Sequence, residues 1–313
     1  MKDVECACLR SQGSLYGMGR NIIALALALC LILGPHIFSA QASPVTFMTA
    51  LPVGADFFVL DEQFLSMPSV MDPTPADRFL GVSAEVSTLA YGVTNDFTVF
   101  SMVPYLWANV DMTMPNGERL SQFMGSFGDI SVFGRYTAYE RDRAGSTLRI
   151  SPLLGFVAPA GGLVVPTGFL PGSWGIEAGV ITTYQTLDYE LDASVTNIAP
   201  TNGAGFFSGV TELDGNFQYR IWPITIGQGL PNFLYAGIET NFIDQGTDNL
   251  NGMLYSEGSM LFLDPTLQFV TESWLLEAAI QVPVYQNLTN YHGFQGLSTA
   301  YILHLGFRFN FNL

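Results

Sequence analysis

The 313-residue chain carries 27 acidic residues against 11 lysines and arginines, a formal net charge of −16. An acidic surface of this kind repels nucleic acid, so no nucleic-acid partner is expected. Hydrophobic residues make up 49% of the chain and charged residues 12%, which is about half the charged share of a soluble domain. With so little charge, part of the apolar surface is expected to face something other than water.

A secretory signal peptide is predicted for residues 1–42. Arg20 precedes the apolar run 22–34, and a small-residue cleavage site of the form Ala-x-Ala follows at 40–42. The run is shorter than the about 20 apolar residues of a transmembrane helix. The exported part begins with a short lead, 43–54, which is expected to be too short for a substantial plug, although it could enter a lumen.

All three cysteines, Cys6, Cys8 and Cys30, fall within the predicted signal peptide. The exported part, 43–313, therefore has no thiol for a disulfide, a metal site or a nucleophile. Cysteine chemistry is excluded as its function.

From residue 55 to the C-terminus, strand-like runs alternate with turn signals, and no helical period competes with them. The predicted strands lie at about 55–65, 79–91, 97–109, 128–139, 147–158, 174–187, 189–198, 209–221, 233–243, 257–270, 273–285 and 299–313. Short connections at 92–96, 140–146, 187–188, 223–232 and 271–273 alternate with mostly longer ones at about 66–78, 110–127, 159–173, 199–208, 244–256 and 286–298. Outer-membrane barrels show this rhythm because their periplasmic turns are short and their extracellular loops long.

The last predicted strand alternates large apolar side chains with polar ones up to its end. Phe307, Phe309 and Phe311 are separated by Arg308 and Asn310. A closed barrel must pair its last strand with its first, because lipid cannot satisfy the hydrogen bonds of an open edge. The predicted strands are about ten residues or longer, which suits a tilted crossing of an apolar band about 25 Å tall.

We therefore expect an all-β fold: a monomeric, transmembrane, antiparallel up-and-down β-barrel of about 12 strands, formed by residues 43–313. A secreted soluble β-protein is the alternative. In that protein the apolar faces of two sheets would meet each other and the polar faces would meet water.

With the apolar faces outward, the polar faces line a lumen. The residues predicted there are Glu85, Asp129, Arg135, Arg149, Glu177, Glu212, Asp214, Arg220, Glu239, Glu277, His304 and Arg308. Rings of such charges can set the selectivity of a pore. Alternatively, they form a salt-bridge network that holds a narrow barrel closed. The mixture of signs argues against a pore for polyanions.

No enzymatic activity is expected, and no catalytic, cofactor-binding or metal-binding residue is predicted. The exported part contains only His292, in a predicted loop, and His304, predicted to face the lumen. No Gly-x-Ser-x-Gly elbow accompanies them. A lipid hydrolase embedded in the barrel is therefore a poorer interpretation than a lumen histidine with satisfied hydrogen bonds.

Four prolines fall inside predicted strands: Pro104, Pro152, Pro265 and Pro283. Each lacks an N–H and so deletes a ladder hydrogen bond. A closed barrel has no free edge to accommodate them, so bulges or kinks are predicted at these positions.

Four segments resemble motifs of one family. The stretch 91–107 has a Tyr-Gly-Val-Thr-Asn turn before a strand that contains Pro-Tyr. The stretch 125–140 has Gly-Asp before a strand that contains Arg and Tyr. The third segment, 164–168, reads Val-Val-Pro-Thr-Gly. The most specific is the hairpin 263–288, with Leu-Asp-Pro-Thr-Leu-Gln, then Trp-Leu-Leu-Glu and Gln-Val-Pro-Val. Over roughly 79–313 the chain resembles the outer-membrane proteins grouped as meta-pathway phenol-degradation proteins, also described as transporters.

The resemblance implies a single outer-membrane barrel for passage of small, often aromatic or hydrophobic compounds. The final strand also resembles the signal read by the barrel-assembly machinery, which normally ends in Phe or Trp where this chain has Leu313. We expect a channel or facilitator in the outer membrane of a Gram-negative bacterium, with membrane lipids, the assembly machinery and a small-molecule cargo as partners and no cofactor. The alternative is a structural or surface-interaction barrel with a salt-bridge-plugged lumen and no transport.

Overall fold

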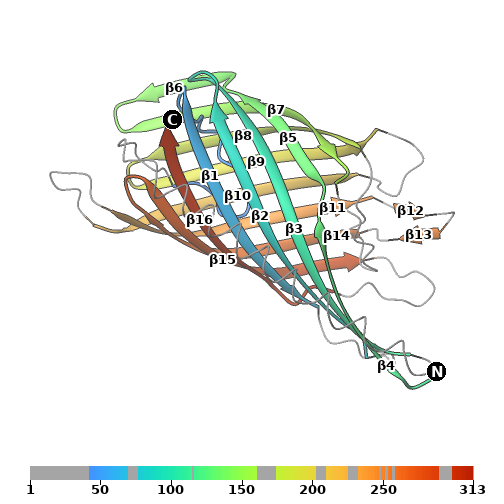
Figure 1. Cartoon of the computed structure of the whole chain (residues 1–313). Helices are drawn as coiled ribbons and strands as arrows, with labels where there is room; N and C mark the ends of the chain where they lie inside the picture. Colours follow the sequence, from blue (N-terminus) through green and yellow to red (C-terminus); the bar gives the residue numbers. More distant parts are fainter. Residues whose placement is uncertain are drawn as a thin grey trace.

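The fold is an antiparallel β-barrel that is closed by pairing between its first and last strands (Figure 1). The computed structural model describes residues 42–69, 77–114, 116–160, 174–201, 209–224, 232–246, 248–250, 253–255, 258–288 and 298–312. The predicted signal peptide lies outside these residues except for Ala42. In the part of the chain that the structure describes, no helix has the length and hydropathy to cross a membrane.

The barrel sheet contains 14 strands. They are β1 (Phe57–Pro68), β2 (Phe79–Gly92), β3 (Phe97–Thr113), β4 (Arg119–Phe127), β5 (Ile130–Tyr136), β6 (Tyr139–Arg143), β7 (Ser146–Ala158), β8 (Gly175–Thr186), β9 (Tyr189–Pro200), β10 (Val210–Trp222), β11 (Phe233–Gln245), β14 (Gly258–Val270), β15 (Trp274–Leu288) and β16 (Ile302–Asn312). A separate small hairpin is formed by β12 (Asp248–Leu250) and β13 (Met253–Tyr255).

β4, β5 and β6 lie end to end and together fill one strand position of the wall, between β3 and β7. β4 and β5 both pair with β3, and β5 and β6 both pair with β7. The wall is therefore a closed barrel of 12 strand positions, and the predicted all-β barrel is confirmed.

The first and last strands pair in continuous register, from Phe57 opposite Asn312 to Ser66 opposite Leu303. This pairing explains why the sequence keeps its alternation up to its end: the final strand closes the wall. In Figure 1, the C-terminus and β6 lie at one end of the barrel, whereas β4 and the β12–β13 hairpin lie at the other. We call these the turn end and the loop end.

The segment 110–127 was expected to be a long connection, and this expectation is wrong. β3 continues to Thr113, and β4 pairs with it from Arg119 onward. The reversal is made at Asn116-Gly117, where Gly117 has a φ of +82° and its N–H bonds to Met114. Glycine adopts this positive φ without strain, and the Asn-Gly pair is a strong hairpin signal in a sequence.

Apolar side chains of the wall point outward and polar ones inward, the reverse of a soluble barrel. On β14, for example, Leu263 and Leu267 are 38% and 47% exposed, whereas Asp264 and Gln268 are fully buried. An outward apolar face is stable only if it contacts lipid or another apolar surface.

The predicted irregularities at the four prolines are confirmed. Pro104, Pro152 and Pro265 stay in register with β2, β8 and β11, respectively. On the opposite side of each proline the pairing is interrupted, and at Pro283 the register with β14 shifts. The N–H and C=O of one residue in an antiparallel strand point to the same neighbour, so a missing N–H interrupts one ladder and leaves the other intact.

We expect Ile280→Arg to lower the free energy of unfolding by about 2–4 kcal/mol, because the new charge would lie in the middle of the lipid-facing band. Ile280 is 46% exposed on β15. Urea unfolding of the exported part in phospholipid vesicles measures the change.

Leu187→Arg serves as the control, because Leu187 is 61% exposed in the turn between β8 and β9. Its cost should be about 0–1 kcal/mol. Equal costs for the two variants would contradict a lipid-facing position for Ile280.

Candidate functional site

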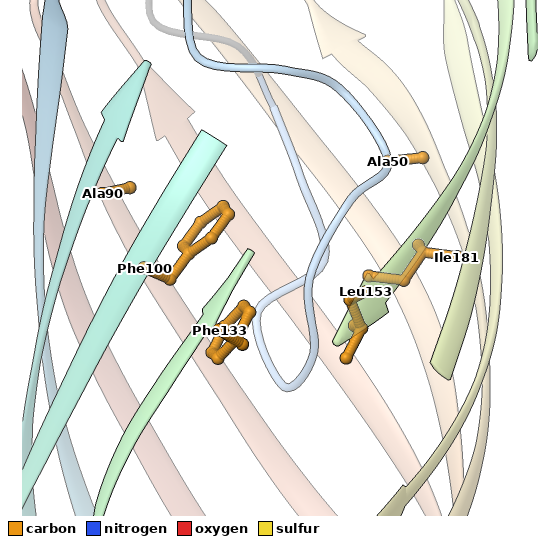
Figure 2. Close-up of a cluster of buried hydrophobic side chains, with 6 residues drawn as sticks. All are labelled: Ala50, Ala90, Phe100, Phe133, Leu153 and Ile181. Atoms are coloured by element: carbon orange, nitrogen blue, oxygen red, sulfur yellow. The ribbon is translucent and has the colours of Figure 1, made fainter. Parts of the chain in front are cut away.

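The lead after the predicted signal peptide runs through the interior of the barrel. We call residues 43–55 the plug segment. It begins beside β14 and β16, crosses to β5, β7 and β8, and returns to β3 before β1 begins. Figure 2 shows it as the coil that loops between the two sides of the barrel.

The expectation that this lead is too short for a substantial plug is therefore wrong. An extended chain covers about 3.3–3.6 Å per residue, so a short coil can cross a barrel of this size. Pro44 and Pro52 lack an N–H, so any ladder that the segment could form with the wall would be interrupted at two places. Its backbone groups must then find partners among the side chains of the lumen.

Glu239 on β11 holds the first part of the plug segment. Its carboxylate accepts hydrogen bonds from the N–H groups of Val45 (2.7 Å) and Thr46 (2.9 Å) and from the Thr46 hydroxyl. The same hydroxyl contacts Asn241 Oδ1 at 3.0 Å. One buried carboxylate thus replaces the strand partner that these amides lack.

Ser43 is held by two long side chains from β14 and β16, which lie on either side of β15 in the wall. Gln268 on β14 accepts from the Ser43 N–H (3.3 Å) and donates to its C=O. Arg308 on β16 donates to the Ser43 hydroxyl and to Asp61 Oδ2 (3.0 Å), and it lies 3.7 Å from Glu277. Arg308 therefore joins the plug segment to the first and last strands of the barrel.

The middle of the plug segment is held by Arg135 on β5. The guanidinium donates hydrogen bonds to the C=O groups of Thr49 and Leu51 and lies 4.7 Å from the centre of the Phe100 ring. On the other side of the coil, Thr183 accepts from the Ala50 N–H at 2.7 Å. The turn is therefore held by β5 and β8, which lie on either side of β7 in the wall.

Ala50 is fully buried in an apolar cluster on one side of the wall (Figure 2). Its partners are Ala90, Phe100, Phe133, Leu153 and Ile181, which come from five strands. Phe100 and Phe133 stack with centroids 4.9 Å apart. This cluster is an inward-facing apolar patch, and it seats the turn of the plug segment.

Most of the predicted lumen residues lie on the inner face. These are Arg135, Glu177, Glu212, Asp214, Glu239, Glu277, His304 and Arg308. His304 contacts Gln281 Oε1 through Nε2 at 2.7 Å. Asp129 lies in the break between β4 and β5.

Glu85 lies on the outer face of β2, contrary to expectation. Its neighbours Ala84 and Val86 point inward: Ala84 is buried, and Val86 lines the cavity beside the plug segment. The outward neighbour Glu62 on β1 accepts a hydrogen bond from Ser87 at 2.7 Å. The polar-inward pattern reverses here because this part of the wall faces the apolar side of the plug segment.

Arg149 and Arg220 form ion pairs near the turn end. Arg149 contacts Glu140 at 2.9 Å and Asp142 at 2.6 Å, and Arg220 contacts Asp188. Deeper in the lumen, the described ion pairs are those of Arg308. A salt-bridge network filling the lumen was the alternative interpretation, but in the described residues the plug segment lies there.

Sequence reasoning missed several inward polar residues. They are Asp61, Gln63, Glu190, Asp192, Asp264, Gln268 and Gln281. Glu190 and Asp192 alternate with apolar residues on β9 and could have been found from that pattern. The plug contacts of Gln63 and Gln268 depend on the position of the lead, which no local pattern indicates.

A cavity of about 540 Å³ separates the plug segment from one side of the wall. β1, β2, β3 and β16 supply most of the wall side, and Arg135 reaches it from β5. Its apolar lining includes Phe47, Val86, Ala90 and Met102. The volume falls within the range of about 300–1,000 Å³ found for small-molecule sites.

No family model and no curated protein sequence matches the chain. The crystal structure of an outer-membrane channel from Pseudomonas putida F1 superposes with a TM-score of 0.59 at 12% identity, covering 87% of this chain and 100% of that one. The β domain of the Bordetella autotransporter BrkA gives 0.47 at 12% identity (82% and 100% covered), and a Pseudomonas aeruginosa FadL homologue gives 0.34 at 10% identity (88% and 98% covered).

The first of these likenesses shows that the chain has the fold of an outer-membrane barrel, whereas the other two scores are too low to carry an argument. Membership of the meta-pathway phenol-degradation family stays a prediction.

We expect Glu239→Ala to loosen the plug segment, because the Val45 and Thr46 amides lose their acceptor. A single cysteine introduced as Phe47→Cys in the otherwise cysteine-free exported part reports the change. Its rate of maleimide labelling should rise about tenfold or more, as expected for the loss of charged hydrogen bonds.

The matched control is Glu177→Ala, which removes another buried lumen glutamate for which no hydrogen bond to the plug segment is seen. Its labelling rate should equal that of the parent. An unchanged rate in Glu239→Ala would show that Glu239 does not hold the plug segment.

Proposed function

We propose that the chain is an outer-membrane channel of a Gram-negative bacterium for passive passage of small hydrophobic or aromatic compounds, and that the plug segment closes it. The carrying observation is the apolar cavity of about 540 Å³ inside the barrel. A water-filled pore would need no such lining, whereas an apolar solute does. The fold shared with the Pseudomonas putida channel supports the proposal.

The membrane position is supported by the outward apolar band, which requires lipid as its neighbour. β16 completes the wall by pairing with β1 and is the part that we propose the barrel-assembly machinery reads.

The alternative is a structural or surface-interaction barrel without transport. The plug segment favours it, since the lumen is occupied along the path of any solute. The two functions differ in one respect: a channel must open when the plug segment leaves, whereas a structural barrel need not conduct at all.

Deletion of residues 43–54 tests this difference. We expect the deletion variant to give single-channel steps and solute flux in liposomes well above those of the intact exported part, because the wall keeps its own ladder without the plug segment. The heat-dependent shift in gel mobility that folded barrels show confirms folding. A folded variant with no flux above protein-free liposomes would favour the structural barrel.

A reversible lock tests whether the plug segment moves during transport. The Thr49 and Thr183 hydroxyls are 2.9 Å apart, so the pair Thr49→Cys and Thr183→Cys is placed to form a disulfide between plug and wall. Uptake of phenol into vesicles should stop when the pair is oxidised and recover on reduction.

The single variant Thr49→Cys is the control and should respond to neither treatment. Equal uptake by the oxidised and reduced double variant would show that solute does not need the plug segment to move.

A further inference from the structure

Arg135 is a buried cation whose partners are neutral groups. It is 4% exposed, and its hydrogen bonds go to two backbone carbonyl groups of the plug segment. Among the described residues, the ion pairs involve Arg149, Arg220 and Arg308, and Arg135 takes part in none. Burying a charge without a counter-ion is costly, so this position favours an anion.

The cavity beside the plug segment is where such an anion would be held. Arg135 lines it together with the apolar side chains of Val86, Ala90, Phe100 and Met102. One cationic group in an apolar chamber matches a ligand with one anionic group on an apolar body. The guanidinium fork suits a carboxylate, which accepts two parallel hydrogen bonds.

We infer that this cavity binds small aromatic or aliphatic monocarboxylates, with the carboxylate on Arg135 and the apolar body against the inner face of β2 and β3. The inference rests on the proposed function, since it names the class of solute that the channel takes.

The other polar groups of the cavity limit the ligand to a single negative charge. Arg308 also lines the cavity, but Asp61 and Glu277 already balance it. Asp61 Oδ1 and Asn310 Oδ1 are buried acceptors without a hydrogen-bond partner. A second anionic group near them would meet oxygen atoms and be repelled, whereas a hydroxyl group would find an acceptor.

Ligand binding is coupled to the plug segment through Arg135. The guanidinium donates to the carbonyl groups of Thr49 and Leu51, and a carboxylate competes for the same donors. A carboxylate adds the attraction between two opposite charges, which a neutral carbonyl acceptor cannot supply. A bound monocarboxylate therefore weakens the hold on the turn of the plug segment.

Calorimetric titration of the purified exported part in detergent tests the inference, with benzoate and the uncharged benzyl alcohol as probes. We expect benzoate to bind about tenfold or more tightly than benzyl alcohol, since one buried charged pair separates them. Arg135→Gln should remove that preference. Val86→Phe, which adds bulk to the cavity lining outside the cluster around Ala50, should abolish binding of both probes.

Arg220→Gln is the control, because Arg220 lies near the turn end outside the cavity lining, and it should bind both probes as the parent does. Equal affinities of the parent for benzoate and benzyl alcohol would overturn the inference without any variant, even if Arg135→Gln failed to fold. Benzoate binding that persists unchanged in Val86→Phe would also overturn it.

Benzoate binding does not depend on conduction, so the two proposals can fail separately. Binding together with a plug deletion that gives no flux would contradict the channel and leave the ligand site. Flux without a benzoate preference would contradict the ligand site and leave the channel.

Discussion

The structure depends on one constraint: a backbone N–H or C=O group that is removed from water must have a hydrogen-bond partner. The wall meets it by closing, with β1 and β16 completing the ladder. The plug segment cannot meet it in this way, because Pro44 and Pro52 interrupt its N–H groups. Side chains of the lumen supply the partners instead, and this requirement accounts for the positions of Glu239, Gln268 and Arg135.

The charges of the lumen act chiefly on neutral groups. The plug segment contains no charged residue, yet a carboxylate holds its amides and a guanidinium holds its carbonyls. A neutral peptide presents donors and acceptors together, so a wall of mixed sign can bind it along its length. The lumen contains both acidic and basic side chains, and this mixture argued against a pore for polyanions. Binding of the neutral plug segment gives a structural reason for it.

The barrel could be predicted from the sequence because its signals are local. Alternation, strand length and the rhythm of short and long connections are all local features. The hairpin at Asn116-Gly117 was not predicted, although its Asn-Gly pair is also a local signal. The plug segment was not predictable, since its contacts with Glu239 and Thr183 join residues far apart in the chain. Glu85 was misplaced for the same reason: the apolar side of a distant segment packs on its strand and reverses the usual pattern.

The plug segment is bound in a way that permits release. Each of its hydrogen bonds to the wall contributes about 0.5–1.5 kcal/mol, somewhat more where the partner is charged. Ordering its backbone costs about 1–2 kcal/mol per residue, so the gain and the cost are of similar size. The strands of the wall bond to one another independently of the coil inside them. Departure of the coil therefore breaks no ladder, and a change as small as one new partner for Arg135 is enough to shift the balance.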